Sequence, residues 1–169
     1  MVTTTYLEML ARPESARQDL PEGALALRCL KPSPAFYRYL YRETGFRWKW
    51  FERSTVGDKE LGDILCRPGT ELWVFYVDGH PAGFSELMRR DGDVQLQYFG
   101  LMEPYIGKGL GRRWLDWTVA VAWSGETGGS PCSKGCSRFW VHTCSDDHPN
   151  ALSTYQRAGF QIYRTETKP

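Results

Sequence analysis

Along much of the chain, apolar and polar residues alternate with a period of two, which is typical of strands that bury one face. The segments with this pattern are residues 4–10, 24–30, 71–77, 81–88, 94–101, 138–143 and 160–165. Asp78-Gly79 and Asp91-Gly92 separate the third, fourth and fifth of these segments. Because an Asp-Gly pair between two such runs favours a tight hairpin, residues 71–101 are predicted to form an antiparallel meander.

Other segments place apolar residues at helical spacing, three or four residues apart. The predicted helices cover about residues 34–45, 58–66, 110–121 and 149–157. The apolar stripe of the third helix consists of Leu110, Trp114, Trp117 and Val121. This order of elements predicts an α+β (mixed α/β) domain with a central, mostly antiparallel sheet and about four flanking helices. The third helix is expected to be a crossover between two parallel strands.

Composition and charge fit a single domain over residues 1–169. A chain of 169 residues with 41% apolar content can bury a core of its own, and a formal net charge of +1 gives no overall attraction to nucleic acid or an anionic membrane. No secretory signal pattern opens the chain, and the richest apolar run, residues 114–123, is shorter than the ~20 residues of a membrane span. Five irregularly spaced cysteines favour free thiols and a cytoplasmic location. We therefore expect neither a membrane nor a nucleic acid as partner.

A glycine cluster lies between the predicted strand at residues 94–101 and the third helix. The glycines are Gly107, Gly109 and Gly111, and the neighbouring cations are Lys108 and Arg112. Glycines there let backbone N–H groups approach an anion, and the helix N-terminus adds positive potential. The cluster therefore predicts a phosphate or pyrophosphate site, with a plain glycine-rich turn as the alternative. Its spacing matches neither the Walker loop nor the dinucleotide fingerprint, which would need glycine in place of Arg112.

Two segments of the chain resemble motifs of the Gcn5-related N-acetyltransferase (GNAT) superfamily. Ile106-Gly107-Lys108-Gly109-Leu110-Gly111 resembles motif A, Q/R-x-x-G-x-G/A, with Ile106 in the Gln/Arg position. Tyr155-Gln156-Arg157-Ala158-Gly159-Phe160 resembles the Y-x-x-x-G-F ending of the superfamily. The resemblance covers residues 71–165, which it implies to be the acyl-CoA-binding core, while residues 1–70 match in general layout as amino-terminal strands and acceptor-side helices.

The resemblance implies a single N-acetyltransferase domain that transfers an acetyl or other short acyl group directly from acyl-CoA to an amine. Acetyl-CoA or coenzyme A is then the co-substrate, and no metal is needed. The implied cofactor-binding residues are Phe99, Gly100, Leu101, Ile106, Gly107, Lys108, Gly109, Leu110, Gly111 and Arg112. Tyr155 matches the tyrosine that protonates the leaving thiolate, with packing of the last helix as the alternative. A non-catalytic acyl-CoA sensor with the same fold is the alternative function.

The motifs do not identify the general base. Glu86, on the predicted strand at residues 81–88, and His142, on the predicted strand at residues 138–143, could each deprotonate the amine, directly or through water. Solvent could also take the proton. His142 fits the pattern of a hydrogen-bonded core histidine equally well.

Three further patterns allow more than one interpretation. Cys132 and Cys136 have the spacing of a zinc-ligand pair, but no second clean pair follows, so no metal is expected. Asp146 and Asp147 are expected to stabilise the positive end of the last helix. Residues 38–53, rich in aromatic and basic side chains, could form the acceptor wall that the resemblance implies, a platform for single-stranded nucleic acid, or a buried helical lid. The resemblance implies that the acceptor is a small-molecule or protein amine, and it is compatible with a homodimer.

Overall fold

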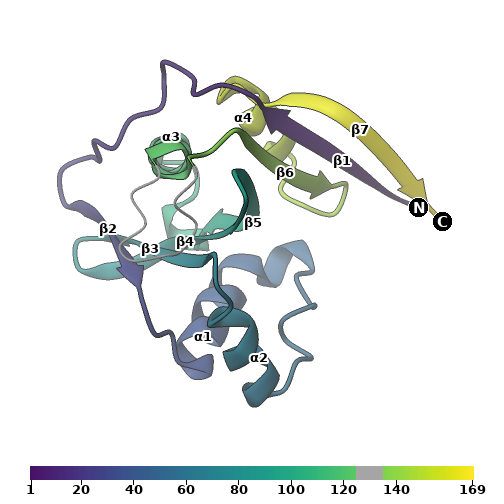
Figure 1. Ribbon diagram of the computed structural model, residues 1–169. Helices are drawn as coiled ribbons and strands as arrows, with labels where there is room; N and C mark the ends of the chain where they lie inside the picture. The colour runs from purple at the N-terminus through teal and green to yellow at the C-terminus, as the bar shows by residue number, and fades with distance from the viewer. Residues whose placement is uncertain (125–134) are drawn as a thin grey trace.

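The computed structural model describes residues 1–124 and 135–169 (Figure 1). These residues form four α-helices and a seven-stranded mixed sheet with the order β2-β3-β4-β5-β6-β1-β7. The strands are β1 (Val2–Met9), β2 (Ala24–Cys29), β3 (Thr70–Val77), β4 (His80–Arg90), β5 (Asp93–Leu101), β6 (Arg138–Cys144) and β7 (Gln161–Lys168). The helices are α1 (Pro34–Gly45), α2 (Asp58–Leu65), α3 (Leu110–Ser124) and α4 (Ala151–Arg157), with the 3-10 helices η1 (Phe46–Trp48) and η2 (Glu103–Tyr105). The predicted α+β class is confirmed.

Two tight turns connect β3, β4 and β5, which pair antiparallel in that order. Asp78 and Gly79 have φ angles of 49° and 81°, and Asp91 and Gly92 have φ angles of 51° and 87°. Both central residues of each turn therefore lie in the left-handed region, as a type I′ hairpin turn requires. Asp and Gly tolerate this region better than most residues, so the meander predicted from the two Asp-Gly pairs is confirmed.

The chain crosses from β5 through α3 to β6, which lies parallel to β5 as predicted. The pairing between these two strands stops at Leu96 and Val141, although β5 continues to Leu101. On its other edge, β5 has a β-bulge at Gln97, where its register with β4 shifts. A bulge bends the strand that carries it, so β5 separates from β6 beyond Gln97.

β1 lies between β6 and β7 and pairs antiparallel with both strands. The two chain termini consequently lie side by side at the far end of the ribbon that β1 and β7 form (Figure 1). The alternation of residues 4–10 predicts a strand, but it contains no information on the partners, which come from the other end of the chain.

Helices cover both faces of the sheet (Figure 1). α1 and α2 share one buried cluster, which includes Tyr37 and Leu61. α3 and α4 contribute to the second cluster, which includes Trp114 and Tyr155. Trp114 is fully buried and stacks on Phe75 of β3 with ring centroids 4.9 Å apart, so the predicted apolar stripe of α3 faces the sheet.

The helix boundaries differ little from the predicted ones, with one informative exception. α4 begins at Ala151 instead of Pro149, and its N-cap residue Asn150 makes no side-chain capping hydrogen bond. The residues before Asn150 therefore form a separate loop between β6 and α4. Among the described residues, no helix is long and apolar enough to cross a membrane.

Candidate active site

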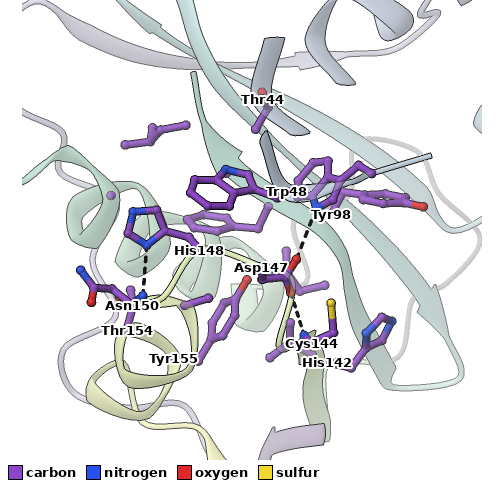
Figure 2. Close-up of a pocket in the computed structure, with 18 of the residues that line it drawn as sticks. Thr44, Trp48, Tyr98, His142, Cys144, Asp147, His148, Asn150, Thr154 and Tyr155 are labelled. Atoms are coloured by element: carbon purple, nitrogen blue, oxygen red, sulfur yellow. Dashed lines mark hydrogen bonds between the residues drawn. The ribbon is translucent and has the colours of Figure 1, made fainter. Parts of the chain in front are cut away.

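A cavity of about 1020 Å³ opens where β5 and β6 separate (Figure 2). Its walls come from β5, β6, the segment that follows α1, the glycine cluster before α3, and the loop between β6 and α4. Tyr155 of α4 lies in the same cavity. Segments that are far apart in the sequence therefore meet at the gap between two parallel strands, which is where an open sheet commonly binds its ligand.

The glycine cluster forms one side of the cavity. Gly107 and Gly109 have φ angles of 80° and 76°, and a Cβ atom added to either residue would meet no atom within 4 Å. The cluster leads directly into α3, whose N-terminus carries unpaired N–H groups and positive potential. This arrangement fits a phosphate or pyrophosphate group, because the backbone is both exposed and bent in a way that favours glycine.

Most of the residues implied as cofactor-binding line this cavity. They are Phe99, Gly100 and Leu101 of β5, together with Ile106, Gly107, Gly109, Gly111 and Arg112. Lys108 and Leu110 do not line it, and the Lys108 ammonium lies over the Tyr105 ring, 5.9 Å from its centroid. Arg112 does line the cavity and pairs with Asp116 one turn further along α3, with Nε and Oδ1 2.9 Å apart.

The end of β5 packs closely against α1. A Cβ atom on Gly100 would lie 2.6 Å from Cγ2 of Thr44, so glycine is needed for this approach. Phe99 faces the other side, where its ring is 6.3 Å from the Tyr155 ring. The backbone of Phe99 and Gly100 is thereby held between Tyr155 on α4 and Thr44 on α1.

The Tyr155 ring lies beside Phe99 of β5. Its side chain is nearly buried, and its ring packs edge-on against Phe99 and against Phe160, whose centroid is 5.8 Å away. Burial raises the pKa of the Tyr155 phenol above its usual value, and the charge of Asp147 raises this pKa further. The phenol therefore keeps its proton at neutral pH, as a general acid must before it acts.

The two predicted base candidates have different surroundings. Glu86 is fully buried and does not line the cavity; its carboxylate accepts hydrogen bonds from the Tyr37 hydroxyl and from Nη2 of Arg53, which is 2.9 Å away. Burial raises the pKa of Glu86, while Arg53 and Tyr37 act in the opposite direction. The Glu86 carboxylate is thus paired behind the lining of the cavity, and its role as the general base stays a prediction. His142 is exposed and lines the cavity.

The sequence interpretation missed the role of Asp147. Its carboxylate was expected to face the start of α4, but Oδ2 accepts hydrogen bonds from the Thr143 hydroxyl at 2.6 Å and from the Cys144 amide at 2.8 Å. Its Oδ1 atom faces Nε1 of Trp50 at 3.5 Å (Figure 2). The signal in the sequence is a carboxylate a few residues beyond one of the two predicted parallel strands, where side chains often line a site.

The aromatic and basic segment at residues 38–53 divides between core and cavity. Tyr41 on α1 is buried and also lines the cavity, as do Trp48 and Trp50 beyond α1. The segment thus contributes to both the core and the cavity, and its role as an acceptor wall stays a prediction. Of the two cysteines with the spacing of zinc ligands, Cys136 is outside the lining of the cavity, and Cys132 falls outside the described residues. In the described part of the chain, no group of three His, Cys, Asp or Glu side chains is arranged to hold a metal.

The fold and the position of the cavity define a GNAT-like acyltransferase architecture, and comparisons with known proteins agree. The model of the acetyltransferase (GNAT) family matches residues 33–160, and the chain belongs to this family. No curated protein is significantly similar to the chain in sequence.

Solved structures show the same fold at low sequence identity. A GCN5-related N-acetyltransferase from Sphaerobacter thermophilus has a TM-score of 0.65 and 15% identity, and the match covers 97% of this chain and 49% of that one. A tandem GNAT protein from the clavulanic acid biosynthesis pathway has a TM-score of 0.65 and 14% identity, over 96% of this chain and 51% of that one. An aminoglycoside acetyltransferase from an uncultured soil metagenomic sample has a TM-score of 0.61 and 12% identity, over 83% and 90%. The chain thus spans about half the length of the first two.

Proposed function

We propose that the chain is an N-acyltransferase that moves an acetyl or other short acyl group from acyl-CoA to the amino group of a small molecule or a protein. Membership of the GNAT family supports acyl transfer. The observation that carries the proposal is that one cavity joins the glycine cluster, the separated strands and the protonated Tyr155. An anion site, a channel and a proton donor are what the transfer of an acyl group from a coenzyme A thioester requires.

We infer one direction in which coenzyme A would lie in this cavity. The amides at Gly107 and Gly109 and the N-terminus of α3 would hold the pyrophosphate, with Arg112 adding positive charge. The pantetheine arm would follow the gap between β5 and β6. The thioester would then lie beside Phe99 and Gly100, where backbone amides can polarise its carbonyl group.

The reaction is a direct displacement. The neutral amine attacks the carbonyl carbon, the N–C bond forms, and the C–S bond breaks. Tyr155 donates its proton to the departing sulfur and is reprotonated from solvent. The proton that the amine loses goes to His142, to Asp147 or to water, all of which the open cavity makes accessible. No metal takes part in this proposal.

Release of free thiol from acetyl-CoA in the presence of amines tests the proposal. We expect release above the rate of hydrolysis, and we expect Tyr155→Phe to slow it while the affinity for coenzyme A stays unchanged. If the protein binds acetyl-CoA but releases no thiol with any amine, it is a binding module and the proposed reaction is wrong.

A further inference from the structure

The charges around the cavity are unevenly distributed. Arg112 and Arg157, which belong to α3 and α4, are the cations expected near the phosphates of coenzyme A. The remainder of the lining, between the segment at residues 48–52 and the β6–α4 loop, contains the carboxylates Glu52, Asp146 and Asp147 and the cation Lys49. We call this part of the cavity the acceptor end. Lys49 is already paired with Asp146, its Nζ atom lying 3.2 Å from Oδ2, so carboxylates exceed cations there.

The carboxylates are held in position by neighbouring groups. Asp147 is fixed through Oδ2 by Thr143 and Cys144, while Oδ1 has only the long 3.5 Å contact to Trp50. Glu52 accepts a hydrogen bond at 2.6 Å from the Tyr98 hydroxyl. An ionised carboxylate accepts about four hydrogen bonds in all, so each of these groups has capacity for a further donor.

Aromatic rings form a wall beside these carboxylates. The ring centroids of Trp50 and Tyr98 are 5.2 Å apart, those of Tyr41 and Trp50 are 5.5 Å apart, and those of Tyr41 and Tyr98 are 5.2 Å apart. The faces of Trp and Tyr rings attract organic cations. The Arg53 guanidinium already lies over the Tyr98 ring, 5.4 Å from its centroid, so the wall attracts positive charge as the three carboxylates do.

Two buried polar atoms near the cavity have no hydrogen-bond partner in the described part of the chain. The Thr44 hydroxyl, on a residue that is only 4% exposed, and Oε1 of Gln97 have no hydrogen-bond partner among the described residues. Both residues line the cavity. Both atoms have less than 1 Å² of exposed surface, so the cost of about 1–3 kcal/mol for leaving such an atom unpaired is a property of the lining itself and does not identify the ligand.

We propose that the acceptor is an amine with a second cationic nitrogen, such as a diamine or polyamine. The inference rests on the proposed function and names its substrate class. The reacting ammonium binds beside Asp147 and Tyr155, loses one proton to become nucleophilic, and loses its second proton as the amide forms and the thiol leaves. The second cation lies between the rings and Glu52 or Asp146. An acceptor with a carboxylate in that place would be repelled by both groups.

Three probes of equal chain length test the proposal. Cadaverine carries a second ammonium on its fifth carbon, n-pentylamine carries only hydrogen there, and in δ-aminovalerate the fifth carbon is a carboxylate. With acetyl-CoA and the intact protein, we expect the kcat/KM for thiol release to fall by about tenfold from cadaverine to n-pentylamine and further for δ-aminovalerate. Equal values for cadaverine and n-pentylamine, or the highest value for δ-aminovalerate, would overturn the inference and leave the acyltransferase function standing.

Variants locate the second cation. Glu52→Gln and Asp146→Asn are each expected to reduce the preference for cadaverine over n-pentylamine by about threefold to tenfold. Asp63→Asn is the matched control, because Asp63 is exposed on α2 and lies outside the cavity lining. A loss of preference in the control, or none in both cavity variants, contradicts the proposed position.

Calorimetry separates this inference from the proposed function. Cadaverine is expected to bind the complex with coenzyme A more tightly than n-pentylamine does, whether or not it is acylated. Selective cadaverine binding without thiol release would refute the acyltransferase function and support the cation site. Absence of selective binding would refute the cation site.

Discussion

Removal of Arg53 is expected to destabilise the fold, because it leaves the buried charge of Glu86 without a counter-ion. The Arg53 side chain is 9% exposed and that of Glu86 is 0% exposed, and Nη2 lies 2.9 Å from Oε1. In Arg53→Met, the Glu86 carboxylate keeps the Tyr37 hydroxyl as a donor but loses its counter-ion. Breaking a buried ion pair from one side costs about 3–5 kcal/mol, a large part of the about 5–15 kcal/mol that stabilises a typical domain.

The pH dependence of this loss follows from the pKa of Glu86. Arg53 lowers that pKa against the effect of burial, so its removal raises the pKa of Glu86 further above the usual value of 4.5. With a raised pKa in the folded state, protonation of Glu86 stabilises the fold, and this stabilisation is lost as the pH rises through the folded-state pKa. Arg53→Met should therefore lose least at about pH 5 and most at about pH 8.

Urea unfolding at several pH values measures both effects. The double variant Arg53→Met/Glu86→Gln is the control, because it removes the unpaired charge while the amide can still accept a hydrogen bond from Tyr37. We expect it to be more stable than Arg53→Met by at least about 1 kcal/mol at neutral pH. A loss below about 1 kcal/mol in Arg53→Met, or no recovery in the double variant, would show that the ion pair has no such role. Because Arg53 follows the segment at residues 48–52, the KM for the amine is also expected to rise more than that for acetyl-CoA.

Three other predictions concern the cavity. Gly109→Ala is expected to weaken coenzyme A binding by about tenfold in calorimetry, because its φ of 76° costs an alanine about 1–2 kcal/mol. Gly111→Ala is the control, since a Cβ atom there would make an ordinary contact at 3.6 Å. Equal losses of affinity in both variants would refute the conformational reason. Gly100→Ala is expected to lower the free energy of unfolding by about 1–3 kcal/mol, since its Cβ would lie 2.6 Å from Thr44; unchanged stability in urea would disprove the close approach. Tyr155→Phe is expected to lower kcat by about 10²-fold or more with little change in stability. In the wild type, the raised pKa of Tyr155 keeps the proton donor intact up to at least about pH 10, so a fall in kcat below that pH that is absent in Tyr155→Phe would contradict the raised pKa.

Local signals in the sequence predicted most of the elements and the backbone shape of the glycine cluster. The Asp-Gly pairs determine the turns of the meander by backbone preference alone, and the glycines before α3 favour the left-handed backbone of a candidate anion site for the same physical reason. The stripe with Trp114 predicted the buried face of α3 because the helical period is a property of neighbouring residues.

Non-local contacts were out of reach of the sequence patterns. The place of β1 between β6 and β7 depends on pairing across the whole chain. The role of Glu86 depends on Arg53 and Tyr37 coming from other elements, and a glutamate in a strand carries no sign of such partners. The sequence assigns Asp147 to the helix end, because Trp50, which its Oδ1 atom faces, lies 97 residues away in the chain and becomes its neighbour only in the fold. The homodimer stays a prediction.

The central claim is that the cavity binds acyl-CoA and passes its acyl group to an amine with Tyr155 as proton donor. The most direct measurement is single-turnover acyl transfer from acetyl-CoA to cadaverine, followed by mass spectrometry of the amine and by free thiol, in the wild type and in Tyr155→Phe. The account predicts acetylated cadaverine and thiol in equal amounts, with formation at least about 10²-fold slower in Tyr155→Phe at equal coenzyme A affinity. Bound acetyl-CoA that yields no acetylated amine, or an unchanged rate in Tyr155→Phe, would contradict it.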